Sequence, residues 1–193
     1  AEWSECAAKA AFLRAPPPPF DLIETFGWDG QAFTPALDAH LARMMGSARR
    51  LGFPEICAEA RAALMLLAPD LPPVPCRVRL LLARSGELAV QVTGLAPVPS
   101  APKLALARLP VPANSAFLAH KTSHRRFYDD RRADLARSTG CFEVAFVGAD
   151  GRLGEGSFTT LFVERDGVLL TPPLDAGVLP GVLRAELLAD RRA

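Results

Sequence analysis

The sequence predicts an α+β protein built from two blocks of strands and helices. Apolar runs of strand length alternate with stretches of helical spacing on both sides of a proline-rich segment at 97–102. In the second block, a hairpin signal at 165–167 is followed by a Pro/Gly turn that opens a helix near 182. These patterns indicate two domains with a crevice between them, and small-molecule sites favour such domain interfaces.

The chain is predicted to begin with a separate N-terminal piece. Residues 1–14 carry apolar side chains at helical spacing, and the proline run 16–19 ends this helix and forms a stiff linker. The predicted regions are therefore 1–19, a small α/β domain at 20–102, and a domain at 103–193. The first domain is predicted to contain strands at 20–28, 31–34, 76–83 and 88–92, and helices at 34–51 and 54–67.

The second domain is predicted to form another sheet with one long and one short helix. Residues 111–117 are predicted to be a loop. The polar, basic stretch at 120–138 has a helical composition, and the last helix follows the Pro/Gly turn. The predicted strands are 103–109, 142–147, 161–163 and 168–170, and the predicted last helix is 182–190.

The charge balance, the apolar runs and the spacing of cysteines and histidines argue against several kinds of partner or site. The net charge is +1, with 22 basic and 21 acidic residues, so no nucleic-acid or membrane partner is expected. No apolar run reaches membrane-spanning length and no signal peptide is visible. The four cysteines form no CxxC, and the three histidines lack ligand spacing, so free thiols in the cytoplasm and no metal are expected.

Several short motifs follow one another along the chain in an order that carries information. Lys121 follows Ala119-His120, and 34 positions later Glu155 stands in Gly154-Glu155-Gly156-Ser157. A strand-like run, a hairpin and a Thr-Pro-Pro segment come next, and then the turn Leu179-Pro180-Gly181-Val182-Leu183-Arg184. Together with Asp21-Leu22-Ile23-Glu24-Thr25 and His40-Leu41-Ala42-Arg43-Met44, this order resembles the class IV aminotransferases, from about residue 20 to the end.

The resemblance implies a fold-type IV pyridoxal-phosphate (PLP) enzyme, D-amino acid aminotransferase-like, and C-terminally incomplete in this chain. It implies that Lys121 carries PLP as a Schiff base and that Glu155 meets the pyridine nitrogen. Burial and nearby cations lower a lysine pKa far enough for such chemistry, and a carboxylate keeps the pyridine nitrogen protonated. It also implies phosphate contacts from Arg43 and from the backbone N–H groups of Val182 and Leu183, as a helix start allows.

Departures from the family pattern narrow the subfamily. Arg126 stands where a tyrosine is frequent, with Tyr128 two residues later, and Leu183 replaces a threonine of the branched-chain enzymes. The N-terminal piece and the 120–129 segment look like the lyase part of fused aminodeoxychorismate synthase/lyase proteins, so an upstream chorismate-binding domain is possible. Arg125, Arg126 and Tyr128 are candidate substrate residues, and His120 and His124 could flank the cofactor.

Three functions stay open at this point. The first is an aminodeoxychorismate lyase of folate biosynthesis, which converts 4-amino-4-deoxychorismate to 4-aminobenzoate and pyruvate. The second is a transaminase acting on branched-chain or D-amino acids with 2-oxoglutarate. The third is a truncated, non-catalytic module retained for dimer contacts. A homodimer acting on a small-molecule substrate is expected for either enzyme.

Overall fold

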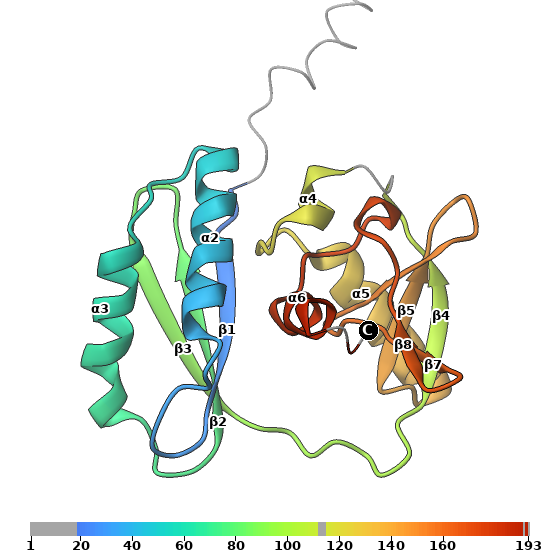
Figure 1. Cartoon of the computed structure of the whole chain (residues 1–193), viewed down its shortest axis with the longest axis horizontal. Coiled ribbons are helices and arrows are strands. Elements are labelled where there is room, and N and C mark those ends of the chain that lie inside the picture. Colours follow the sequence, from blue (N-terminus) through green and yellow to red (C-terminus); the bar gives the residue numbers. More distant parts are fainter. Residues whose placement is uncertain (1–18, 112–114, 191, 193) are drawn as a thin grey trace, which may run out of the picture.

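The structure is a computed structural model that describes residues 19–111, 115–190 and 192, arranged as two lobes joined by the segment at 95–103 (Figure 1). The helix predicted for 1–14 lies outside the described residues. In the first lobe, one antiparallel sheet has the order β1-β2-β3. Its elements are β1 (Leu22–Trp28), α2 (Leu37–Leu51), α3 (Cys57–Leu67), a short 3₁₀ turn (Ala68–Asp70), β2 (Cys76–Leu82) and β3 (Leu88–Gly94).

Helix α2 forms where the apolar spacing predicts it and covers the sheet. Leu41, Met44 and Ala48 lie on one face of the helix, are almost fully buried, and pack into the first lobe's core. Gly52 ends the helix in a left-handed conformation, with φ of 72°, and its N–H bonds to the carbonyl of Ala48. His40 and Arg43 lie on another side of the helix, which faces the second lobe.

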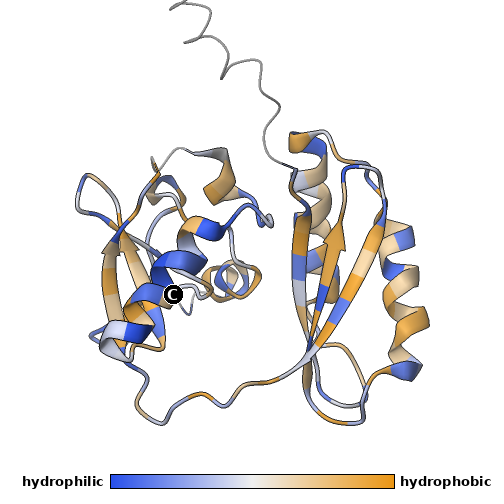
Figure 2. Cartoon of the chain, turned by 180° about the vertical axis from the view of Figure 1, so that it is seen from behind, coloured by the Kyte–Doolittle hydropathy of each residue, from blue (hydrophilic) through white to orange (hydrophobic). Residues whose placement is uncertain are grey.

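The second lobe has a mixed sheet of order β4-β5-β6 and a separate two-stranded sheet. Strands β4 and β5 are parallel and are joined through α5, whose outer surface is mainly hydrophilic (Figure 2). The long connection is required because parallel strands cannot be joined by a tight turn. The elements are β4 (Leu104–Arg108), α4 (Ala116–Ala119), α5 (Arg126–Thr139), β5 (Glu143–Val147), β6 (Leu153–Gly156), β7 (Val163–Arg165), β8 (Val168–Leu170), a 3₁₀ turn (Leu174–Ala176) and α6 (Val182–Ala189).

The structure corrects the predictions for four segments. Residues 31–34 form no strand, because Asp29 Oδ1 accepts hydrogen bonds from the N–H groups of Gln31 and Ala32 and curls the chain. The segment predicted as a loop at 111–117 runs into the short helix α4, and β6 was not predicted. The strand predicted at 161–163 is β7, which begins at Val163 and pairs only with β8, outside the β4-β5-β6 sheet.

The two lobes are connected by backbone pairing as well as by the linker. The N–H of Ile23 donates to the carbonyl of Lys121 at 2.9 Å, and the N–H of Ser123 donates to the carbonyl of Asp21 at 2.8 Å. Residues 121–123 thus lie along the edge of β1, next to the cavity described below. Among the helices of the described residues, none is long and apolar enough to cross a membrane.

Candidate active site

A cavity of about 230 Å³ lies between the lobes and is lined by both of them. Its lining side chains come from helix α2, from the segment before α5 and the first turn of α5, from the end of β6 with the loop after it, and from the start of α6. Most of the predicted site residues line it. The lining residues discussed below are His40, Arg43, His120, Lys121, His124, Arg125, Tyr128, Glu155, Ser157, Thr159, Thr160, Gly181, Val182 and Leu183.

Lys121 reaches this cavity from a fixed backbone. Its carbonyl and the neighbouring Ser123 are held by β1, so the side chain starts from a strand edge rather than a free loop. Burial lowers the pKa of Lys121 from 10.5 to about 8, and the positive charges of Arg43 and Arg125 act in the same direction. The carboxylates Glu24 and Glu155 oppose the shift. The result is an amine that can lose its proton close to neutral pH.

The Glu155 side chain extends from β6, and its carboxylate accepts hydrogen bonds from two donors. The Tyr128 hydroxyl donates to Oε1 at 2.8 Å, and the N–H of Leu179 donates to Oε2 at 2.9 Å. Burial raises the pKa of Glu155, while these two bonds and the charges of Lys121 and Arg125 act against the rise. The carboxylate is therefore fixed in place, and a cationic partner in the cavity would favour its charged form.

Helix α6 begins at the same cavity. An α-helix leaves its first backbone N–H groups without intrahelical acceptors, so those of Val182 and Leu183 are free to bind an anion. An added Cβ at Gly181 would stand 2.8 Å from Thr160 Oγ1, so any larger residue here would force that side chain to move. Arg43 Nη1 donates to the carbonyl of Pro180 at 3.0 Å, which brings the guanidinium to this turn. The arrangement suits a phosphate group.

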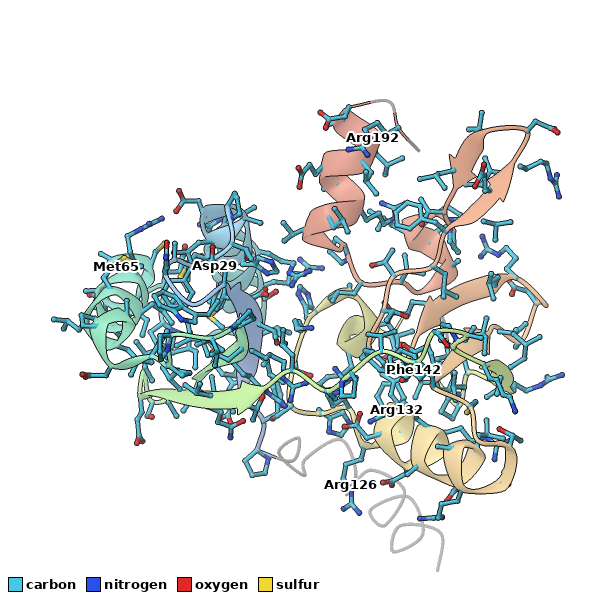
Figure 3. All side chains as sticks on the ribbon, turned by 90° about the horizontal axis from the view of Figure 1, so that it is seen from below. Asp29, Met65, Arg126, Arg132, Phe142 and Arg192 are labelled. Atoms are coloured by element: carbon cyan, nitrogen blue, oxygen red, sulfur yellow. The ribbon has the colours of Figure 1, made fainter. Side chains whose placement is uncertain are left out.

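The three candidate substrate residues have different positions. Arg125 lines the cavity and donates to the Ser157 carbonyl and, at 3.2 Å, to Asp129 Oδ1. The structure does not bring Arg126 into the cavity, because its side chain is 90% exposed and extends outward from the start of α5 (Figure 3). Arg125 is the residue before the helix and Arg126 is its first residue, and of the two only Arg125 lines the cavity. Tyr128 is buried, and its hydroxyl donates a hydrogen bond to Glu155 and is therefore not free for a substrate.

The two histidines beside Lys121 also line the cavity. His120 Nδ1 is 3.0 Å from Ser47 Oγ on α2, and burial, with a smaller effect of Arg50, lowers the pKa of this imidazole. The ring of His124 packs against that of Phe117, with 4.5 Å between their centroids. Among the described residues, no group of three or more His, Cys, Asp or Glu side chains is arranged to hold a metal ion.

Sequence reasoning missed two buried carboxylates. Glu24 on β1 binds His40 and Arg43, and Glu143 on β5 organises the loop after β6. Glu143 accepts hydrogen bonds from the N–H of Ser157 at 3.0 Å, the N–H of Phe158 at 3.2 Å and the hydroxyl of Thr159 at 2.7 Å. An acidic residue inside an apolar strand was the available signal in both cases, since buried charges need partners.

Comparisons with known proteins agree with this geometry. The family model described as "Amino-transferase class IV" matches residues 21–192. A Schizosaccharomyces pombe protein provisionally named aminodeoxychorismate lyase is 27% identical over 176 residues, which are 88% of this chain and 74% of that protein. A Thermotoga maritima protein provisionally named branched-chain-amino-acid aminotransferase is 40% identical over 48 residues, 25% of this chain and only 18% of that protein.

Solved structures share the fold. A Mesorhizobium loti protein provisionally assigned as an amino-acid aminotransferase is 40% identical with a TM-score of 0.80, covering 90% of this chain and 84% of that one. A Mycobacterium tuberculosis protein described as a hypothetical aminotransferase, in its PLP-bound form, is 23% identical with a TM-score of 0.72, covering 93% of this chain and 69% of that one. The match to nearly all of the described residues, with this cavity at the junction of the lobes, shows that the chain belongs to the class IV aminotransferase family, with the fold of the fold-type IV enzymes.

Proposed function

We propose that this protein binds PLP in the cavity between the lobes and acts as an aminodeoxychorismate lyase. The observation that carries the proposal is the set of groups gathered there: an amine with a pKa of about 8, a fixed carboxylate, and a helix start beside an arginine. Each group suits one part of PLP, namely the aldehyde, the pyridine nitrogen and the phosphate. The residues present therefore fit the cofactor.

When bound, PLP supplies an electron sink for the bonds being broken in the substrate. The protein's part is to position groups and to move protons. The Lys121 amine is neutral in part near pH 7 and can take the proton from C4 of 4-amino-4-deoxychorismate. The ring then becomes aromatic as its C3–O bond breaks, and enolpyruvate leaves and takes up a proton to give pyruvate. Glu155 places negative charge where the cofactor's pyridine nitrogen would be protonated.

Basic groups around Lys121 suit a substrate with two carboxylates. Arg125 retains N–H donors beyond those used by Ser157 and Asp129, and His120 and His124 carry further ring nitrogens on the same cavity wall. The lyase-named relative spans most of this chain, which favours the lyase. The 40% identical Mesorhizobium loti protein favours the second candidate, a transaminase that uses the same Lys121 and Glu155.

A product assay separates these two activities. Full-length protein given PLP and 4-amino-4-deoxychorismate, without any keto acid, should release 4-aminobenzoate and pyruvate in equal amounts over many turnovers. Lys121→Met should abolish the reaction, while Lys103→Met, a change at an exposed lysine outside the cavity, should leave it intact. Activity that depends strictly on 2-oxoglutarate would establish the transaminase instead. Borohydride reduction with peptide mapping should place the pyridoxyl group on Lys121.

A further inference from the structure

Glu24 is a fully buried carboxylate in the middle of β1. Its strand neighbours Leu22 and Phe26 are core residues, so a lone charge at this position would be costly. Three donor atoms of α2 surround it instead. His40 Nδ1 lies 2.7 Å from Oε2, Arg43 Nη2 lies 2.6 Å from Oε2, and Arg43 Nε lies 2.8 Å from Oε1. Burial alone would raise the pKa of Glu24, but these hydrogen bonds outweigh it and lower the pKa.

The charged state of Glu24 fixes the proton on His40. An ionised carboxylate only accepts hydrogen bonds, so His40 Nδ1 must carry the hydrogen that it donates. That nitrogen cannot then also accept a bond from Arg43 Nη2, which is 3.5 Å away. His40 therefore supports Glu24 and takes up none of the donors of Arg43.

The remaining donors of Arg43 can be counted. A guanidinium has five N–H groups. Two of them bind Glu24 in a fork, and one on Nη1 binds the carbonyl of Pro180. One N–H on Nη1 and one on Nη2 are left, on a side chain that lines the cavity beside Gly181 and the start of α6. An arginine without a carboxylate partner could adopt many rotamers. The guanidinium of Arg43 is instead fixed by Glu24 at Nε and Nη2 and by the Pro180 carbonyl at Nη1.

We propose that Glu24 is a positioning residue that holds the Arg43 guanidinium at the start of α6 so that its two remaining N–H groups bind the cofactor's phosphate. The inference rests on the proposed function, because PLP is the ligand whose phosphate this turn would hold. Glu24 also keeps Arg43 from turning back toward solvent, and it is not itself among the residues that line the cavity. It touches neither substrate nor the reacting atoms.

The test compares PLP with pyridoxal, which lacks the phosphate. Both ligands are titrated into wild-type protein and into Glu24→Gln at a pH of about 9, where Lys121 is mainly neutral in both proteins, and uptake at Lys121 is followed by visible absorbance. The glutamine keeps one acceptor oxygen but loses the charge and one arm of the fork. PLP affinity should fall about 10-fold, as expected for losing hydrogen bonds between charged groups, while pyridoxal affinity should change less than about 2-fold. Inorganic phosphate should compete with PLP less well in the variant.

Matched variants separate an effect on phosphate binding from a general effect of removing a charged side chain. Glu55→Gln makes the same change in the exposed Arg49–Glu55 pair and should alter neither affinity. Arg43→Lys should reproduce the selective loss, and adding Glu24→Gln to it should cost little more, because the two residues act as one unit. Should Glu24→Gln not fold, Glu24→Asp, which is one methylene shorter, should show the same selective loss.

Two results would overturn the inference. Equal losses for PLP and pyridoxal would mean that Glu24 only supports the fold, and an unchanged PLP affinity would mean that Arg43 needs no positioning. Wild-type protein that takes up neither ligand would overturn the proposed function itself and the inference with it. Wild-type uptake with no selective loss in the variants would overturn the inference alone.

Discussion

The acidity of Lys121 can be tested without any cofactor. With a pKa of about 8, the amine is neutral in about one molecule in ten at pH 7. At the ordinary value of 10.5, only about one in 3,000 would be neutral, so the fold raises the nucleophilic fraction about 300-fold. Burial is the main cause, because the cavity removes water from the ammonium form.

Trace labelling of the apoprotein with acetic anhydride, followed by peptide mass spectrometry, measures this fraction. Acylation of Lys121 should rise about tenfold per pH unit below pH 8 and then level off, because only the neutral amine reacts. The exposed Lys103 serves as the internal reference. In Glu24→Gln the midpoint for Lys121 should fall further, because a negative charge that favours the ammonium form is lost.

The same shift has a consequence for stability. The folded-state pKa lies below the unfolded value, so between pH 8 and 10.5 the unfolded chain binds more protons and the free energy of unfolding rises with pH. Lys121→Met should accordingly stabilise the apoprotein at pH 7, by on the order of 3 kcal/mol, since each pKa unit of the shift corresponds to about 1.4 kcal/mol. An acylation profile for Lys121 that keeps rising up to pH 10 would show that the cavity does not lower the pKa of this amine.

Further substitutions test the groups around Lys121. Glu155→Gln should leave circular dichroism unchanged but slow kcat greatly, and an unaffected kcat would mean that another residue serves the pyridine nitrogen. Tyr128→Phe should raise the pKa of Glu155 further, since a donor to the carboxylate is lost, and should shift the acidic limb of the kcat–pH profile upward. Glu143→Ala leaves several buried donors unpaired and should lower the free energy of unfolding by on the order of 3 kcal/mol in urea titrations. Arg125→Ala should raise KM for a dicarboxylate substrate at least about 10-fold, whereas Arg126→Ala should match wild type, and a reversed ranking would contradict the orientation of α5.

Segments whose structure depends on nearby residues were predicted well. The apolar spacing of α2 and the glycine that ends it lie within one stretch of chain, so the helix and its end were predicted correctly. The hairpin of β7 and β8 follows from Asp166-Gly167, where both residues take positive φ. By contrast, β6 carries two glycines in four residues, and it becomes a strand only through its pairing with β5.

In the candidate site, too, some features depend on local sequence and others on contacts between distant residues. Lys121, Glu155 and the turn before α6 could be recognised in the sequence, because their order along the chain is a family pattern that needs no coordinates. Their chemistry depends on contacts between distant residues. The pKa of Lys121 follows from burial beside Glu24 and Arg43, and Tyr128 supports Glu155 only because α5 packs against β4 and β5 and brings the hydroxyl to the carboxylate. Residues 1–18 have no described structure, so the N-terminal helix stays a prediction. Spacing along a chain identifies residue types, whereas burial, charge and orientation arise only when the lobes pack together.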